Sequence, residues 1–485
     1  MSQGNDLKEV QLEPVYYVAN QRAEFRLPEG RIFSTDLFLA NLGMTCPTQN
    51  PGQYGKYAGV YGTLTNVTLY DGNVVLSNIN DTGRWAGFKM FNKGDDYAQG
   101  VGRYMNYANT SYVFNNTDIR SLQDQVKRTT TSGKDLYKAR GAGLIEGNIK
   151  GDITLRTGEV GLSGTPRGML RMRHVFDFLN NMPFIDTSFF KDFRIVIEMS
   201  GDPVRTLRAD VALQAAGVNQ GVILGASAGY TTTRPLLFIH ELVDEELKSG
   251  LMGKTPNFAW NEIEEDVVRV LDTPVPGTGN PTPLQSLTFH INGFNNKRLG
   301  RLLMCKEPTG NVLRQIVEPA GSVSRGRVVA NGPFNSYCCL NEKEQIRVNG
   351  RNIFARAGIE GSNRRLAHMV DSWGNCALNS FGASLAYIEA RDQTRAFIVG
   401  GRGSEMIGNE DFLGVDLAGE LVTDLQIDFS RNGVFNELPN ATGNINEGAQ
   451  VSKYNKALNL VIIAEAKKQL VMDASQPRGY SVQYL

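Results

Sequence analysis

The sequence predicts an all-β protein made of two tandem β-sandwiches with a few short helices in the loops. Short runs in which apolar and polar residues alternate recur from one end of the chain to the other, and long helical periodicity is scarce. Glycine accounts for 52 of the 485 residues and asparagine is abundant, so many positions tolerate positive φ and can form turns. A chain of this length suits two domains of roughly 200 to 250 residues each.

The composition indicates a globular chain and excludes several other classes. The 50 lysines and arginines balance the 50 aspartates and glutamates, which excludes a strongly basic sleeve for nucleic acid. Hydrophobic residues make up 41% of the chain, enough for a sizeable core. The first ten residues lack the apolar stretch of a secretory signal, and the longest apolar runs are far shorter than a membrane span of about 18 residues. We therefore expect synthesis in the cytosol or nucleus.

The strongest local signals are turn dipeptides that accept positive φ between strand-like runs, as in type I′ hairpins. Each of the first three stands between two runs of apolar and β-branched residues, and the fourth follows the run LQIDFSR. The dipeptides are Asp71-Gly72, Asn292-Gly293, Asn349-Gly350 and Asn432-Gly433.

Two strongly β runs mark the ends of the two sandwiches. The first is FRIVIEM at 193–199, and the second is LNLVIIAEA at 458–466. In the second run Leu460, Ile462 and Ala464 lie on one face, while Val461 and Ile463 lie on the other. Strands that are apolar on both faces are expected between packed layers. We predict two copies of one sandwich, joined near residues 201–208.

Helices are predicted only locally. The segment RPLLFIHELVDEELKSGLMG begins as a strand and passes near Asp244 into an acidic helix that Gly250 or Gly253 can end. The segment NRRLAHMVDSWG predicts a second helix, because Leu366, Met369 and Val370 recur at helical spacing. Residues 272–283, rich in glycine, proline and threonine, predict a long exposed loop.

One motif favours a serine hydrolase. Residues 225–229 match the G-x-S-x-G nucleophile elbow around Ser227 and follow the apolar run GVIL. The elbow has to lead into a helix, yet the residues that follow, YTTTRPLLFIHE, are β-branched and contain a proline. Only four histidines are available as a base, namely His174, His240, His290 and His368. We interpret residues 225–229 as a loop and keep the hydrolase as an alternative of a different class.

Two further motifs resemble phosphate-binding loops but lack essential residues. Gly253-Lys254-Thr255 lacks the glycine that should stand five residues earlier, where the chain has Lys248. Residues 400–403, GGRG, lack the third glycine of a dinucleotide fingerprint. We interpret the first as the turn after a helix and the second as a bulge or tight turn.

Metal ligands are not clustered in the sequence. No two histidines are close, and the adjacent Cys338 and Cys339 would point to opposite faces of a strand. An odd number of cysteines without a CxxC pair argues against a disulfide framework. We interpret all five as structural thiols: Cys46, Cys305, Cys338, Cys339 and Cys376.

Charged and aromatic side chains give no stronger site. The carboxylate run at 262–272 could form a glycosidase acid pair, but we predict a charged, exposed sheet edge. The pairs Lys127-Arg128 and Arg364-Arg365 predict ordinary surface or subunit-contact charge. A carbohydrate-binding module is disfavoured because only Trp85, Trp260 and Trp373 could serve as stacking platforms. We predict no catalytic, cofactor-binding or metal-binding residues.

Three longer segments carry a resemblance to a known family. Residues 168–199 run from an apolar stretch through a proline-marked turn to a strand reading Arg-Ile-x-Ile-Glu. Residues 59–92 contain GVYGTLTNVTLYDGNVVLSNI followed by WAGFKMFN, and residues 345–374 contain QIRVNGRNIF followed by NRRLAHMVDSWG. In this order they resemble the double jelly-roll major capsid proteins of double-stranded DNA viruses, such as Polinton-like viruses, adintoviruses and virophages.

The resemblance implies an architecture and an assembly. It implies one eight-stranded jelly roll at 21–203 and a second at 204–485, after residues 1–20, whose lack of a clear period predicts an arm that orders only on a partner. It implies a homotrimer that forms a pseudo-hexameric capsomer, with capsomers tiling an icosahedral shell around the genome in the virion. The implied partners are neighbouring capsomers, penton proteins, minor or cement proteins and an internal membrane, without sequence-specific nucleic-acid binding and without cofactors.

Two details of that assembly stay open in the sequence. Residues 272–283 and 432–448 are candidates for outward towers or for contacts between subunits. A minor or vertex capsid protein, which would form pentamers, is the alternative within the same class.

Overall fold

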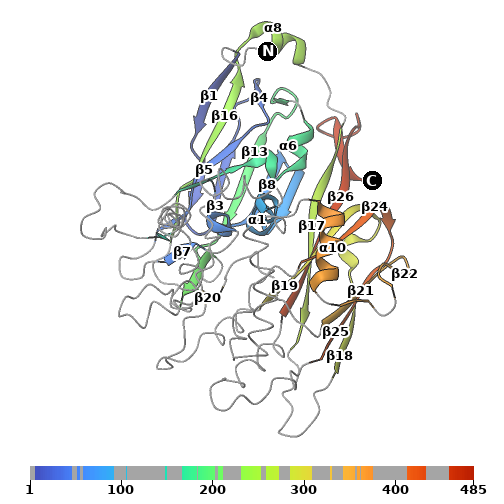
Figure 1. Cartoon of the computed structure of the whole chain (residues 1–485). Helices are drawn as coiled ribbons and strands as arrows, with labels where there is room; N and C mark the ends of the chain where they lie inside the picture. The colour runs from blue at the N-terminus through green and yellow to red at the C-terminus, as the bar shows by residue number, and fades with distance from the viewer. Residues whose placement is uncertain are drawn as a thin grey trace, which may run out of the picture.

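The computed structural model describes residues 6–45, 52–54, 58–91, 105, 148–149, 167–182, 184–202, 206–210, 231–252, 258–271, 284–308, 328–329, 342–355, 358–360, 362–374, 412–432 and 458–485. Strands dominate these residues and the helices are short, so the predicted all-β class is confirmed (Figure 1). None of the helices in these ranges is long and apolar enough to cross a membrane.

The second half of the chain forms a sandwich of two antiparallel sheets. Sheet III has the order β17 (Ala259–Val270), β26 (Leu458–Met472), β19 (Lys297–Pro308) and β24 (Leu413–Val422), with β27 (Tyr480–Tyr484) also paired to β26. Sheet IV has the order β18 (Leu284–His290), β25 (Leu425–Asn432), β21 (Glu342–Val348) and β22 (Arg351–Asn352), with β23 (Ile359–Glu360) also paired to β21. From β17 to β26 the strands of these two sheets alternate between them, except that β21, β22 and β23 all lie in sheet IV. β26, the last of the long strands, pairs with the first, β17. This connectivity is a jelly roll.

The first half forms a sandwich with the same central pairing. Sheet II has the order β2 (Tyr16–Val18), β3 (Arg22–Arg26), β13 (Phe193–Met199), β8 (Leu64–Asp71) and β9 (Val74–Asn80). Sheet I has the order β11 (Gly168–Arg171), β5 (Phe38–Leu42), β16 (Leu236–Leu242), β4 (Ile32–Ser34) and β12 (Phe184–Asp186), with β1 (Leu7–Leu12) also paired to β16. β13 lies between β3 and β8 as β26 lies between β17 and β19.

Smaller elements complete the described part. One short sheet pairs β6 (Met44–Thr45) with β15 (Thr231–Thr232). A second short sheet has the order β10 (Asn148–Ile149), β7 (Gly52–Tyr54), β14 (Leu207–Asp210) and β20 (Val328–Val329). The helices are α1 (Thr82–Phe91), α6 (Asp177–Asn181), α8 (Glu245–Leu251) and α10 (Ser362–Trp373), with 3₁₀ turns η1 (Gly59–Thr63), η2 (Met172–His174) and η4 (Asn292–Phe294).

Strand β26 has a core on each side, as the sequence predicted. Leu460, Ile462 and Ala464 belong to the core between sheets III and IV. Val461 and Ile463 belong to the other core, which consists mainly of residues of the first sandwich. Sheet III is therefore an inner layer, covered by sheet IV on one face and by the first sandwich on the other.

Strand pairing places the ends of the first sandwich differently from the sequence prediction. Within the predicted arm 1–20, Leu7–Leu12 form strand β1, and within the predicted second jelly roll, Leu236–Leu242 form its partner β16. Leu237 and Ile239 of β16 are buried in the first core, which holds this strand in sheet I. On this pairing we propose a boundary between residues 252 and 258, in place of 203/204.

The four predicted hairpins have different outcomes. Asn349 and Gly350, with φ of 51° and 77°, connect β21 to β22 as a type I′ turn requires. At Asp71-Gly72 the hairpin β8–β9 is present, but Asp71 pairs with Val74 and only Gly72 of the two loop residues has positive φ, so the turn is not type I′. Gly433 lies outside the described residues.

The hairpin predicted at Asn292-Gly293 is wrong. The dipeptide lies in the 3₁₀ turn η4, and the strands on either side, β18 and β19, belong to opposite sheets. Ile291 and Phe294 are buried in the core between those sheets, so this corner carries the chain from one layer to the other.

The two predicted helices are present. Asp244 caps α8, its Oδ1 accepting from the backbone N–H groups of Glu246 and Leu247 at 2.9 and 3.0 Å. α10 buries Met369 and Trp373 against β24, where Gly414 leaves the space that Ser372 and Trp373 fill.

Two glycine substitutions test this local geometry. Gly350→Ala should lower the free energy of unfolding by about 1 kcal/mol, because φ is positive there and a Cβ would meet no atom within 4 Å, leaving backbone strain as the only cause. Gly250→Ala, in the exposed helix α8 with the same open space, should instead raise it by up to about 1 kcal/mol. Urea unfolding of both variants checks the pair. Equal shifts of the same sign would contradict the assignment of the turn.

Candidate functional site

Most residues that the sequence singled out for chemistry lie outside the described ranges. These are Ser227 with its flanking glycines, Gly253-Lys254-Thr255, the GGRG segment at 400–403, Cys46, Cys338, Cys339, Cys376 and Lys127-Arg128. The loops 272–283 and 433–448 lie outside them as well. Cys305 is described and is a buried free thiol of β19.

The four histidines lie in four different places. His240 Nε2 is 3.7 Å from Glu9, and His290 Nδ1 is 3.7 Å from Asp424. His368 packs edge-on against Phe354, and His174 borders a small pocket. No group of three or more potential ligands among the described His, Cys, Asp and Glu residues could hold a metal ion.

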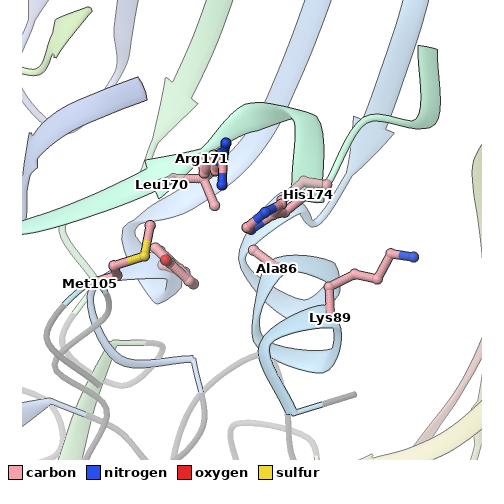
Figure 2. A pocket seen from close by; sticks show the side chains of 8 residues that line it. Ala86, Lys89, Met105, Leu170, Arg171 and His174 are labelled. Atoms are coloured by element: carbon pink, nitrogen blue, oxygen red, sulfur yellow. The ribbon is translucent and has the colours of Figure 1, made fainter. Parts of the chain in front are cut away.

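The pocket beside His174 is too small for an organic ligand. It lies between helix α1 and the segment from β11 to η2, and is lined by Tyr61, Ala86, Lys89, Met105, Leu170, Arg171, His174 and Val175 (Figure 2). Its interior has room for about one water molecule, whereas ligand sites are typically of ~300 Å³ or more. The Lys89 side chain points away from it (Figure 2), and burial lowers the pKa of the Lys89 ammonium.

The junction between the two sandwiches is the most elaborate site of the described structure. All three tryptophans of the chain are buried in it: Trp85 of α1, Trp260 of β17 and Trp373 of α10. Trp85 and Trp373 meet across the junction with ring centroids 5.8 Å apart at 70°. Phe178 of α6 meets Trp260 at 5.0 Å and 83°. These edge-to-face contacts add to the hydrophobic burial of large rings.

Two sheet edges face each other in the junction without forming a ladder. β9 is an edge of sheet II and β17 is an edge of sheet III. Glu262 of β17 reaches across, and its Oε1 accepts from the backbone N–H of Asn78 at 2.5 Å and from Ser77 Oγ at 3.2 Å. Its Oε2 accepts from Trp260 Nε1 at 2.7 Å. The carboxylate thus satisfies a backbone donor that the edge strand leaves free.

Glu262 is nearly fully buried, and burial raises the pKa of its carboxyl group. Lys468, whose Nζ is 3.8 Å away, and the three hydrogen-bond donors act in the opposite direction on that pKa without cancelling the effect of burial. A group whose pKa is higher in the folded state makes folding less favourable as the pH rises from its ordinary pKa to the raised one.

Ion pairs extend the junction on either side of Glu262. Arg84 of α1 donates to Glu265 of β17 at 2.7 Å while its guanidinium is also 3.0 Å from Asp81. Arg301 of β19 forms a bidentate pair with Glu465 at 2.7 Å for both bonds, and it stacks over Trp373 at 4.1 Å. Arg84 and Glu265 are both largely buried, and breaking a buried pair of this kind typically costs about 3–5 kcal/mol, because one charge stays buried alone.

A second polar contact fixes the C-terminal part of sheet III to the first hairpin. Asp71, fully buried at the end of β8, accepts from Tyr480 Oη at 2.7 Å, Arg478 Nη1 at 3.3 Å and the backbone N–H of Asp192 at 2.9 Å. Burial and the bond to Asp71 raise the pKa of Tyr480, which therefore stays a donor. Gly72 has a φ of 58°, which favours glycine, and a Cβ there would also displace the Arg478 guanidinium from its place beside Asp71.

Two sequence interpretations are wrong here. The carboxylate run at 262–272 was predicted to be an exposed edge, but Glu262 and Glu265 are turned into the junction. Arg365 was predicted to be surface charge, but it is buried and paired with Glu344, which also faces Lys306 at 3.4 Å. Charge alone predicts exposure, and only strand pairing shows that another layer covers these side chains. The buried Glu262 has no signal in the sequence beyond its place in a strand.

Comparisons with known proteins support the same fold. No protein-family model matches the chain, and no curated protein matches it in sequence. VP54 of PBCV-1, in a crystal structure fitted into a cryo-EM reconstruction of the virophage Sputnik, is similar with a TM-score of 0.54 at 11% identity over 100% of this chain and 98% of that one. A quasi-atomic structure of the PBCV-1 virus capsid gives 0.53 at 10% identity, with the same two shares covered.

These matches span both sandwiches. The double jelly-roll fold that the sequence resemblance implied is confirmed.

A tyrosine pair tests the contribution of the Asp71 contact. Tyr480→Phe removes one donor from a buried carboxylate and should lower the free energy of unfolding by about 1.5–3 kcal/mol. Tyr484→Phe is the matched control, because its partner Glu264 lies at the partly exposed rim and less than about 1 kcal/mol is expected. Denaturation followed by tryptophan emission checks both, since all three tryptophans report on the junction. Equal losses would contradict the buried role of Tyr480.

A pH series tests the Glu262 carboxyl group. Its raised pKa predicts that the parent chain loses stability, relative to Glu262→Gln, as the pH rises from about 4.3 through the raised value. Thermal midpoints of both proteins between pH 4 and 8 check this. A difference that stays constant over this pH range would contradict the prediction, because it would mean that the Glu262 carboxyl group has the same pKa in the folded and unfolded states. A difference that grows in favour of the parent chain with rising pH would contradict it.

Proposed function

We propose that this chain is the major capsid protein of a double-stranded DNA virus, and that three copies form a pseudo-hexameric capsomer of an icosahedral shell. One observation carries the proposal: two jelly rolls in a single chain are held in one relative orientation by a buried, hydrogen-bonded junction. The two solved chains that it superimposes on over nearly their whole length are VP54 of PBCV-1, fitted into a reconstruction of a virophage, and a chain of the PBCV-1 virus capsid.

The geometry suits such a capsomer. Three copies of a rigid two-sandwich unit supply six sandwiches, so a ring with threefold symmetry has a pseudo-sixfold outline. The relative orientation of the two sandwiches has to be fixed within each chain for that ring to close. The aromatic contacts and ion pairs of the junction supply this rigidity, and the balanced net charge lets copies crowd without long-range repulsion.

The partners and location follow from the same proposal. The chain would reside in the virion after synthesis in the host cytosol or nucleus, in contact with neighbouring capsomers, penton proteins and minor or cement proteins. An internal membrane is a further proposed contact. The proposed role is structural, without catalysis, and needs no sequence-specific binding of nucleic acid.

The mass of the purified particle tests the proposal. Light scattering coupled to size exclusion should give a species of three times 53.4 kDa, and negative-stain images should show a hexagonal outline. Five copies would favour the vertex protein instead. A stable monomer would overturn the capsomer and return attention to the hydrolase, which an active-serine probe on the parent chain and on Ser227→Ala then tests.

A further inference from the structure

The free edge of strand β18 differs from the other long sheet edges in the described part of the chain. β18 (Leu284–His290) pairs with β25 over seven consecutive residues without a bulge, and no other described strand pairs with it. Its sequence, LQSLTFH, contains no Asp, Glu, Lys or Arg, no glycine and no proline. A regular, uncharged edge of this kind is a template for another strand, because its backbone N–H and C=O groups are unpaired.

The other edge strands of six or more described residues are protected. β1 carries Lys8 and Glu9. β24 carries Asp416 and Glu420, and a bulge opposite Leu299–Arg301 where Ala418 and Gly419 have positive φ. β9 and β17 cover each other in the junction. Charges, bulges and covering elements are the usual means by which proteins prevent edge pairing. β18 has no charged residue other than its histidine and no bulge, and no element of the described ranges pairs with its free edge.

Comparison of the two sandwiches shows that this same edge is covered in the first one. In the second sandwich β18 follows β17. In the first sandwich β4 and β5 follow β3, which is the equivalent of β17, so β4 and β5 together are the equivalent of β18. β25 pairs with β18 as β12 and β11 pair with β4 and β5. In the first sandwich β16 pairs with the outer edge of β4 and β5, and β1 then covers β16. The second sandwich lacks this addition in its described part.

We propose that β18 pairs antiparallel with β18 of a second copy, about a twofold axis at Leu287. This inference rests on the sheet topology and does not depend on the proposed capsid role. In that register Ser286 lies opposite Thr288 of the other copy, and Leu284 lies opposite His290. No ionisable group meets a like one, so this register brings no like-charge repulsion. Hydroxyl side chains opposite each other also favour antiparallel pairing.

The surroundings of β18 support an identical strand as the occupant. On the outward face Thr288 Oγ1 is 2.7 Å from Asp428, whose carboxylate is also paired with Arg347, so the nearest charges are already satisfied. On the inward face Leu287 and Phe289 are only partly buried against the core between sheets III and IV. A second copy of β18 would bring its own Leu287 and Phe289 to that face and cover both pairs. The contact is isologous, so each β18 edge is saturated by one other copy of β18.

Paired cysteines test the register. In the full-length chain, Ser286→Cys/Thr288→Cys places each new thiol opposite the other kind in the second copy, at the Cα separation of about 4.5–5.5 Å that suits a disulfide. Mild oxidation should link chains in pairs, and mass spectrometry should identify a 286–288 bridge between copies. Each single variant should link at least about tenfold more slowly, because its thiol faces a hydroxyl. Double-variant linking no faster than the single variants or the parent chain would overturn the proposal.

Added edge charge tests the contact without cysteine. Sedimentation velocity at rising concentration should show the parent particle associating into species of at least twice its mass, and Ser286→Lys/Thr288→Lys should weaken that association by about tenfold or more. Glu9→Lys/Gln11→Lys, on the exposed edge strand β1, is the matched control and should leave the association unchanged. A parent particle that never associates, or equal effects of the two variants, would overturn the proposal. Neither outcome of this experiment bears on how many copies form the single, unassociated particle, so the capsomer proposal is judged separately.

Discussion

Strand β26 has to bury both of its faces, and the arrangement of the molecule follows from that requirement. One face, with Leu460 and Ile462, is covered by sheet IV in the ordinary way of a β-sandwich. The other face, with Val461 and Ile463, would be exposed in an isolated second jelly roll, and the first sandwich covers it. Burial of apolar surface stabilises by roughly 25 cal/mol per Å², so separating the two halves would expose a continuous apolar layer. The two jelly rolls therefore share a hydrophobic core, although each has its own strand topology.

Apolar burial alone would let the two layers slide or rotate, and the polar groups of the junction remove that freedom. β9 and β17 are edges with unpaired backbone groups, and bringing them together in the interior would leave those groups without partners. Glu262 accepts the N–H of Asn78 and so satisfies one edge from the other. Asp71 accepts from the side-chain hydroxyl of Tyr480 and so links the first hairpin to the C-terminal part of sheet III. Buried charges are costly, as the raised pKa of Glu262 shows, and their hydrogen bonds are directional, so they favour one relative placement over its neighbours.

Sequence periodicity predicted the parts of the fold that are set locally. The two-faced pattern of β26, the Asp244 cap of α8 and the turn at Asn349-Gly350 each depend on a few neighbouring residues, and each is present. Features set by distant partners were not predictable in the same way. The Asn292-Gly293 dipeptide has the composition of a hairpin turn, but the burial of Phe294 between two sheets turns it into a corner. Glu262 stands in a run of acidic residues, and nothing local distinguishes it from exposed neighbours.

The same limit explains why the end of the first sandwich was misplaced. β13 is the last strand that the jelly-roll pattern requires, so the pattern gives no reason to expect a later strand to return to it. Yet Leu237 and Ile239 of β16 bury their side chains in the first core, and β1 pairs along the whole length of β16. This two-strand addition makes the sandwiches unequal at equivalent edges, since the second has no such cover in its described part. A ring built from three such chains has two alternating kinds of sandwich at its border, so its neighbours meet chemically different edges at alternate positions. A pseudo-sixfold particle can thereby keep a threefold pattern of contacts.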